Sequence, residues 1–380
     1  MLVQTRLLTI ELWCVYIAVA EVNVAPETTR RDHSIGVCTM RLIVRRAACI
    51  PMVLVVVFCC GTTLFAETHG RGELPEEPSP AGSTAVPRKS ESPWVLEARI
   101  RKYVNSHTSY EFGNPFPPHQ VPLSRLEFPL DSIWGGLEVR RSFNRFSAGV
   151  EFLTSFRDQE TGRFKDSDWD DDAEPALLTI YGETNCRLEP SYQVRADLDM
   201  QVADLLGLSG RFDLRPVIGL RRQRFSLVAH DGAQVDVYGP GVLLLPGDSI
   251  AFEQKWSQYF VGLKFGYDFG PKFGLHRLKL GTQLDWGEVD GENEDRHLLR
   301  VGNRVTTENT DGHAWHGMLG IVAGLTKIID LGLEVDYLRI KSTGTHRLQN
   351  DLFDLDFSFS NGVTVWSEQT SIIVKLAYRF

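Results

Sequence analysis

The stretch Tyr192-Gln-Val194-Arg-Ala196-Asp-Leu198-Asp-Met200-Gln-Val202 decides the fold of this chain. Apolar and polar residues alternate along it, so an extended backbone would carry one apolar face and one polar face. The same alternation recurs in residues 259–269, 278–286 and 372–380. The sequence therefore predicts an all-β protein built from amphipathic strands.

Ten such strands can be counted after residue 93, and tight turns alternate with long polar segments between them. This layout, with apolar stripes and an even strand number, is typical of outer-membrane barrels. We expect a ten-stranded antiparallel transmembrane β-barrel with long extracellular loops. The expected strands cover residues 94–104, 124–140, 145–156, 190–206, 211–229, 252–269, 275–289, 303–326, 330–344 and 363–380, and the expected long loops cover 105–123, 157–189, 230–251, 290–302 and 345–362.

A soluble antiparallel sandwich would also alternate, but it would bury the apolar faces and expose the charged ones. The barrel is favoured because nearly every strand has a charged face and because the strands exceed the usual five or six residues. The final strand is amphipathic and ends in Phe380, as in many bacterial outer-membrane proteins.

The N-terminal part divides by composition. Residues 1–39 are interpreted as an over-extended start and residues 40–66 as a signal peptide, with Arg41, Arg45 and Arg46 before a short apolar run. Residues 67–92, rich in Pro, Glu and Ser, are expected to be a linker, and residues 93–380 the barrel domain. Five of the six cysteines precede residue 67, so Cys186 alone can form neither a disulfide framework nor a thiolate metal site. The formal net charge of −9 disfavours a nucleic-acid partner.

Two acidic motifs carry possible chemistry. Asp166 and Asp168 stand two residues apart, so in an extended segment both carboxylates point the same way. Neighbouring carboxylates resist ionising together and can hold a proton or a water between them. The alternative is a solvated acidic loop. A calcium loop of the EF-hand type is excluded, because Asp171 stands where the turn needs Gly and Leu177 where it needs Glu.

The second motif is Asp295-Arg296-His297. A carboxylate that accepts a hydrogen bond from an imidazole fixes its tautomer and leaves the other nitrogen free to take a proton from water. The alternative is a surface salt link. The strand count places both motifs at the same end of the barrel on roughly opposite walls, where a flattened barrel would let them share one water.

At this point the sequence resembles the omptins, ten-stranded outer-membrane endopeptidases of bacteria. Their Asp-x-Asp-Trp and Asp-x-His motifs match residues 166–169 and 295–297, and Tyr259-Phe260-Val261-Gly262-Leu263 belongs to the same resemblance. It implies an aspartyl-type endopeptidase in the bacterial outer membrane, with its active site facing the cell exterior. It also implies that Asp295 orients His297, that His297 and Asp166 activate a water, and that Asp168 assists.

The resemblance implies further partners. Omptins cut next to Arg or Lys through an acidic pocket, and here Asn293 stands where one acid is expected. Glu292 and Glu294 are alternatives for that acid, and Glu111 is a candidate for the other. Arg224 and Lys255 match positions that bind lipopolysaccharide as an activating lipid; no other cofactor and no metal is implied. The alternative role of Arg224 and Lys255 is the basic girdle that any outer-membrane barrel has at the level of the lipid headgroups. Peptide or protein substrates, outer-membrane lipid and a monomeric state are expected. The alternative function is a non-catalytic barrel serving as adhesin or surface scaffold.

Overall fold

The computed structural model describes residues 94–380 except residues 115, 118 and 240. The segments expected to be an over-extended start, signal peptide and linker lie outside these residues. No helix in the described part is long and apolar enough to cross a membrane. The described elements are β1 (Trp94–Tyr103), β2 (His107–Phe112), β3 (Ser124–Pro129), β4 (Ile133–Phe143), β5 (Phe146–Ser155), β6 (Gln159–Asp168), β7 (Ile180–Leu188), β8 (Tyr192–Met200), β9 (Phe212–Asp236), β10 (Gly241–Lys272), β11 (Leu275–His297), β12 (Arg304–Gly324), β13 (Ile329–Asn350), the 3-10 helix η1 (Asp351–Phe353) and β14 (Leu355–Arg379).

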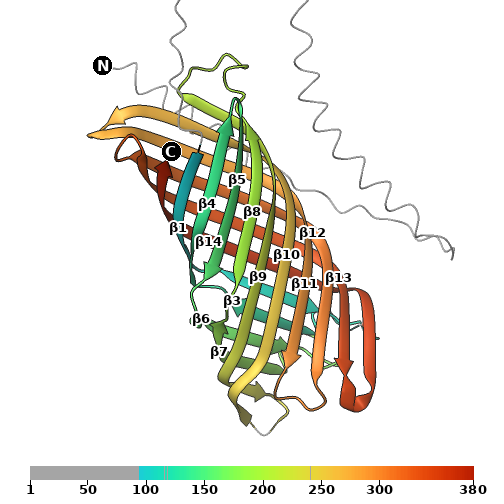
Figure 1. Cartoon of the computed structure of the whole chain (residues 1–380). Helices are drawn as coiled ribbons and strands as arrows, with labels where there is room; N and C mark the ends of the chain where they lie inside the picture. The colour runs from blue at the N-terminus through green and yellow to red at the C-terminus, as the bar shows by residue number, and fades with distance from the viewer. Residues whose placement is uncertain (1–93, 115, 118, 240) are drawn as a thin grey trace, which may run out of the picture. The chain divides into compact units, whose positions relative to one another are not determined.

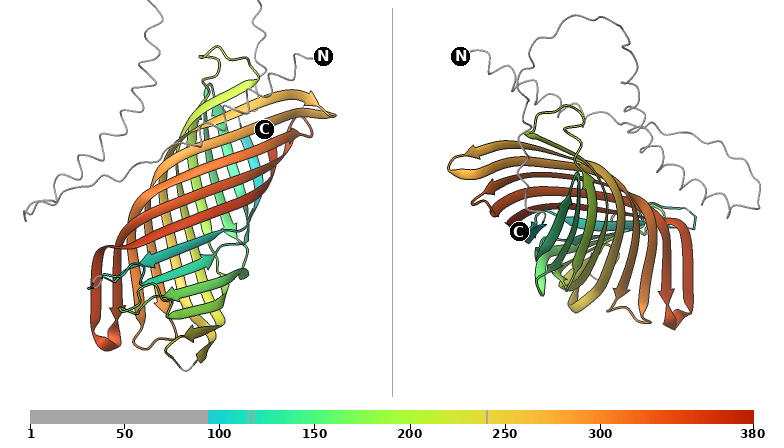
Figure 2. Two further views of the ribbon diagram at one scale, coloured as in Figure 1. Left: turned by 180° about the vertical axis from the view of Figure 1, so that it is seen from behind. Right: turned by 45° about the horizontal axis from the view of Figure 1, so that its top comes forward.

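These strands form two stacked rings that share β9 to β14 (Figures 1 and 2). In one ring β1, β4, β5 and β8 complete the wall, and β1 pairs with β14 to close it. In the other ring β2, β3, β6 and β7 take their places, and β2 pairs with β14 while β7 pairs with β9. Each ring therefore has ten strands. The prediction of a ten-stranded antiparallel barrel is confirmed. Each of its first four strands is interrupted once, so that it appears as two elements: β1 and β2, β3 and β4, β5 and β6, and β7 and β8.

The predicted lengths of the loops are wrong at one end of the barrel. Segments 157–189, 230–251, 290–302 and 345–362 consist largely of strand, because β6, β7 and the ends of β9 to β14 occupy them. We call this end the loop end and the opposite end, with the tight connections, the turn end. At the turn end Phe273 and Gly274 join β10 to β11 with positive φ angles of 53° and 76°, as a type I′ hairpin requires.

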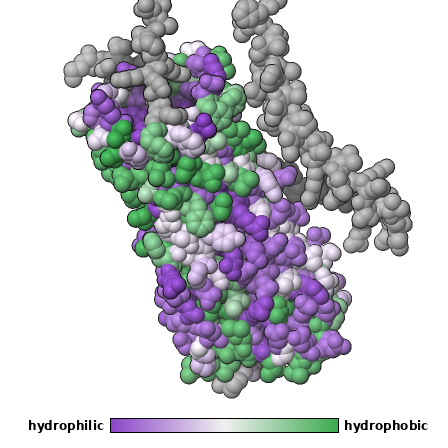
Figure 3. All heavy atoms as spheres, viewed as in Figure 1, coloured by the Kyte–Doolittle hydropathy of each residue, from purple (hydrophilic) through white to green (hydrophobic). Residues whose placement is uncertain are grey.

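The two faces of the strands separate as the alternation predicts. On β8 the polar residues Gln193, Asp197 and Asp199 are buried inside the barrel, whereas Leu198 is exposed. Exposed apolar side chains on the other strands build an apolar surface that covers the part of the barrel nearer the turn end (Figure 3). The apolar face therefore points outward, as a lipid-facing wall requires.

Ion pairs fill the interior near the turn end. Arg99 lies 3.2 Å from Glu97, 3.1 Å from Glu138 and 3.4 Å from Glu334, and it also contacts Glu151. Buried charges are tolerated only when opposite charges and hydrogen bonds compensate for the lost water. Further toward the loop end the interior becomes apolar, and the rings of Tyr103, Trp134 and Phe225 pack edge to face with centroids 5.6 to 6.4 Å apart.

Candidate active site

The two acidic motifs lie on strands at the loop end. Asp166 and Asp168 are the last inward-facing residues of β6, and Asp295 and His297 occupy the same position on β11. In the ring at the loop end, β7, β9 and β10 separate these two strands on one side. The motifs therefore stand on roughly opposite walls at the same end, as expected, although they belong to strands and not to loops.

A row of stacked aromatic rings lies beneath the motifs. Tyr110 on β2 stacks on Phe252 on β10 at 5.7 Å, and Phe252 stacks on Phe128 on β3 at 4.1 Å. Phe128 contacts Phe164 on β6 at 4.5 Å. Phe164 precedes Asp166 by two residues, and Phe252 is the register partner of Asp295. We call these four residues the aromatic floor, because they join the two walls and exclude water below the carboxylates.

Asp295 and His297 form a close pair. The Nε2 atom of His297 lies 3.4 Å from Oδ2 of Asp295, and the same oxygen accepts a hydrogen bond from the hydroxyl of Tyr110. Asp295 is fully buried, which disfavours its charge, but His297, Tyr110 and Arg304 together hold the pKa of its carboxyl below the ordinary value. Asp295 is therefore a charged, fixed partner for the imidazole.

Asp166 and Asp168 have the opposite electrostatic character. Burial, together with the charge of Asp168, raises the pKa of Asp166 to about 7, against the opposing effect of His297. Burial also raises the pKa of Asp168, while the hydroxyl of Ser124 and the guanidinium of Arg300 oppose the rise. Near neutral pH this pair thus holds a proton that isolated carboxylates would release.

Electrostatic interactions also link the two motifs. The charges of His297 and Asp295 both act on the carboxyl of Asp166, and Arg300, which follows β11, acts on Asp166 and Asp168. A base with a buried carboxylate partner therefore faces a second carboxyl that titrates near neutrality. Such an arrangement can bind a water from both sides and remove one of its protons.

The two residues expected in a substrate pocket lie on different faces of the wall. Asn293 points inward on β11, next to Glu308, its register partner on β12. Glu111 points the other way on β2, because its neighbour Tyr110 occupies the inward position, and it forms an ion pair with Arg125 at 2.5 Å. The structure therefore does not bring Glu111 and Asn293 together.

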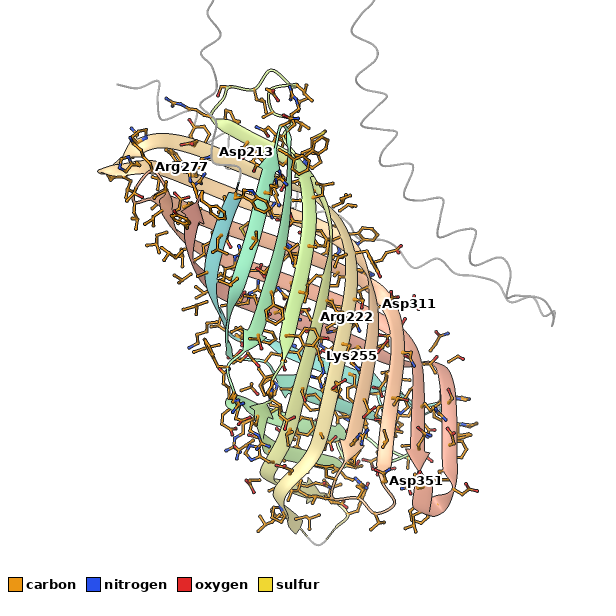
Figure 4. All side chains as sticks on the ribbon, in the orientation of Figure 1. Asp213, Arg222, Lys255, Arg277, Asp311 and Asp351 are labelled. Carbon is orange, nitrogen blue, oxygen red and sulfur yellow. The ribbon has the colours of Figure 1, made fainter. Side chains whose placement is uncertain are left out.

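The two residues expected to contact lipid lie together on the outer wall. Arg224 on β9 and Lys255 on β10 are register partners, and both pair with Glu253, Lys255 at 2.6 Å. Figure 4 shows Lys255 on the barrel wall between the turn end, marked by Arg277, and Asp351 at the loop end.

Several residues near the motifs were not anticipated from the sequence. They include Tyr110 and Arg300. They also include the buried Glu308, which lies close to Asp295 and whose carboxylate is 2.9 Å from Nδ1 of His346. Burial and the charge of Asp295 raise the pKa of Glu308, which His346 and Asn293 oppose. Asn293, Glu308 and His346 are register partners on three neighbouring strands. This register was the only signal that could have identified Glu308, and it requires the strand pairing to be known. Among the described residues no group of three or more His, Cys, Asp or Glu is arranged to hold a metal ion.

The chain is similar to known proteins in both sequence and fold. The model of the Omptin family matches residues 123–380. Among solved structures, the outer membrane protease OmpT from Escherichia coli superposes with a TM-score of 0.67 at 15% identity, covering 77% of this chain and 98% of that one. The translocator domain of the autotransporter NalP from Neisseria meningitidis gives a TM-score of only 0.32 at 9% identity, covering 77% of this chain and 90% of that one. No curated protein matches the sequence. Because the family model covers well over half of the chain, this protein belongs to the Omptin family.

Proposed function

We propose that this member of the Omptin family, an outer-membrane protease, hydrolyses peptide bonds with a water held between Asp166 and His297. The loop end would face the cell exterior, where substrates arrive. One observation carries the proposal: Asp166 and His297 lie at the inward-facing ends of β6 and β11, on opposite walls of the loop end above one aromatic floor. A carboxyl that titrates near neutrality opposite an oriented imidazole supports water activation.

In the proposed step His297 accepts a proton from the water, whose oxygen forms a bond to the peptide carbonyl carbon. Asp295 stabilises the imidazolium that results, and Asp166 accepts the second hydrogen bond of the water. The carbon–nitrogen bond then breaks as the imidazolium of His297 gives its proton to the leaving amine, which restores the neutral base. Asp168 assists by sharing a proton with Asp166. Water is the nucleophile, so the reaction is of the aspartyl type and forms no covalent enzyme intermediate.

We further propose that the enzyme prefers bonds next to basic residues. The resemblance implies this preference, but Asn293 replaces an expected acid and Glu111 faces away from the interior. Glu308 supports the proposal, because it supplies a buried carboxylate beside Asn293 and near Asp295. The basic residue would then be recognised by charge from β12.

Lipopolysaccharide is the proposed activating lipid. Arg224 and Lys255 lie on the outer wall, and Glu253 holds both cationic groups close together. Cationic side chains at the boundary of an apolar wall suit the phosphates of a lipid headgroup. The enzyme is proposed to act as a monomer on peptide or protein substrates.

The test uses purified protein refolded with lipopolysaccharide and a library of peptides with a central basic residue. His297→Ala and Asp166→Ala should lose turnover, whereas Asp170→Ala, which alters an exposed neighbouring carboxylate, should keep it. Circular dichroism should show the same β-sheet content in all variants. Full activity of both site variants contradicts the mechanism. A wild-type protein that cleaves no peptide contradicts the enzyme assignment and leaves the adhesin or scaffold alternative.

A further inference from the structure

We propose that Tyr110 is a positioning residue that holds Asp295, and through it His297, in the orientation needed for catalysis. The proposal rests on the proposed function, because it assigns Asp295 and His297 to the hydrolytic step. Tyr110 would touch neither the water nor the peptide. It would act only through the carboxylate that orients the imidazole.

The contact itself is specific. Tyr110 lies on β2, four strands away from Asp295 along the closed ring, so the hydrogen bond crosses the interior of the barrel. The hydroxyl donates to Oδ2, the oxygen that also faces Nε2 of His297. The other oxygen, Oδ1, has no hydrogen-bond partner among the described residues. One carboxylate oxygen therefore carries both contacts that fix the position of Asp295.

The ring of Tyr110 is itself immobilised. It is 1% exposed, stacks on Phe252 at 5.7 Å with planes 20° apart, and stacks on Phe112 at 6.4 Å with planes 22° apart. Phe252 is the register partner of Asp295, so the donor and the acceptor are anchored to the same part of the aromatic floor. A donor held in this way loses little rotamer freedom when it forms the hydrogen bond, which favours precise positioning.

The charge environment makes the hydroxyl a permanent donor. Burial and the nearby carboxylates of Asp295 and Glu308 raise the pKa of Tyr110 well above its ordinary value, so the phenol stays protonated. The groups facing Asp295 are His297 on its own strand, Arg304 and Glu308 on β12, Asp166 on β6 and Tyr110 on β2. Among these groups Tyr110 and His297 donate hydrogen bonds to the carboxylate, and of the two only Tyr110 takes no part in the proton transfer. When a buried carboxylate loses such a donor, its charged form is less stable and its side chain can rotate more freely.

The decisive variant is Tyr110→Phe, which keeps the ring stack and removes only the hydroxyl. A hydrogen bond to a charged group implies a loss of kcat of about 10- to 100-fold, with KM changed less than about 2-fold. The matched control is Tyr103→Phe, which removes a second buried hydroxyl that contacts Arg101 below the floor and should leave kcat unchanged. Thermal unfolding should show that both variants remain folded.

A double-mutant cycle separates positioning from a structural role. In an Asp295→Asn background, adding Tyr110→Phe should reduce the residual kcat by less than about 2-fold, because the carboxylate it positions is already gone. A structural role would instead give additive losses and would overturn the proposal. Wild-type kcat in Tyr110→Phe would also overturn it. If His297→Ala is inactive while Tyr110→Phe is normal, only this inference fails; if His297→Ala is fully active, the proposed function itself fails.

Discussion

Asp168→Asn should allow the enzyme to work at lower pH. The replacement keeps the size of the side chain and removes its charge. Burial and the negative charge of Asp168 are the two largest causes that raise the pKa of Asp166 to about 7. In the proposed mechanism Asp166 must be ionised to hold the water, so activity should rise with pH through the pKa of this pair.

The size of the shift follows from the strand geometry. Side chains two residues apart on one face of a strand are separated by about 6.6 Å, because a strand rises about 3.3 Å per residue. Two unit charges at that distance, at an effective dielectric constant of about 20, repel by about 2.5 kcal/mol, or about 1.8 pKa units. Removing the charge should therefore lower the pKa of Asp166 from about 7 to about 5. Burial still raises the pKa of Asp166 in this variant, so the pKa stays above the ordinary value of an aspartic acid.

The assay is the pH dependence of kcat/KM between about pH 4 and 9 for one peptide that the wild type cleaves. The acidic limb of the Asp168→Asn profile should lie nearly two units below that of the wild type, even if its plateau is lower. Asp172→Asn, which alters an exposed carboxylate beyond β6, serves as the control and should move the limb by less than about 0.3 units. A limb for Asp168→Asn within about 0.5 units of the wild type would show that the two carboxylates do not interact.

Three further outcomes follow from the same structure. Because folding raises the pKa of Asp166, the protonated carboxyl stabilises the fold fully when the pH is below the ordinary pKa of an aspartic acid. This stabilisation is lost as the pH rises through about 7. Asp166→Asn should therefore unfold at a higher temperature than the wild type at pH 8 but not at pH 4, as measured by circular dichroism in micelles. The gain in the free energy of unfolding is at most about 4 kcal/mol, which corresponds to the pKa shift. Glu308→Gln should reduce the preference for basic over neutral residues about 10-fold, measured as a ratio of kcat/KM values in the peptide library. His316 lies 2.7 Å from Asp285 and 2.8 Å from Asp336, so His316→Ala should remove a buried partner from both carboxylates, although Asp285 keeps its hydrogen bond from Gln283. The free energy of unfolding, measured by urea denaturation, should fall by about 3–5 kcal/mol, with kcat little changed.

The membrane-spanning part of the fold was predictable because lipid imposes a pattern. On β8 every inward residue is polar and most outward residues are apolar, which is the alternation that the sequence displays. Beyond the apolar band the outer wall faces water, and no such rule applies. The segment Gln159–Asp168 is polar on both faces except for Phe164, so β6 was interpreted as part of a loop.

The site was predictable in part for a similar reason. The parity of the strand count placed Asp166 and His297 at one end of the barrel, and the number of strands between them placed them on roughly opposite walls. Contacts across the interior depend on the stagger of the strands, which the sequence does not reveal. Tyr110 and Glu111 illustrate this limit: a difference of one residue decides which of them faces Asp295 and which faces outward.

The packed interior has a consequence for the membrane that surrounds the barrel. Trp134, Trp256 and Phe225 are completely buried in the middle of the ring, and the aromatic floor lies between them and the loop end. An ion entering from the mouth would have to shed its hydration shell and displace packed rings before reaching the paired charges beyond. A cell can therefore display many copies of this protein without making its outer membrane permeable to salts or small solutes.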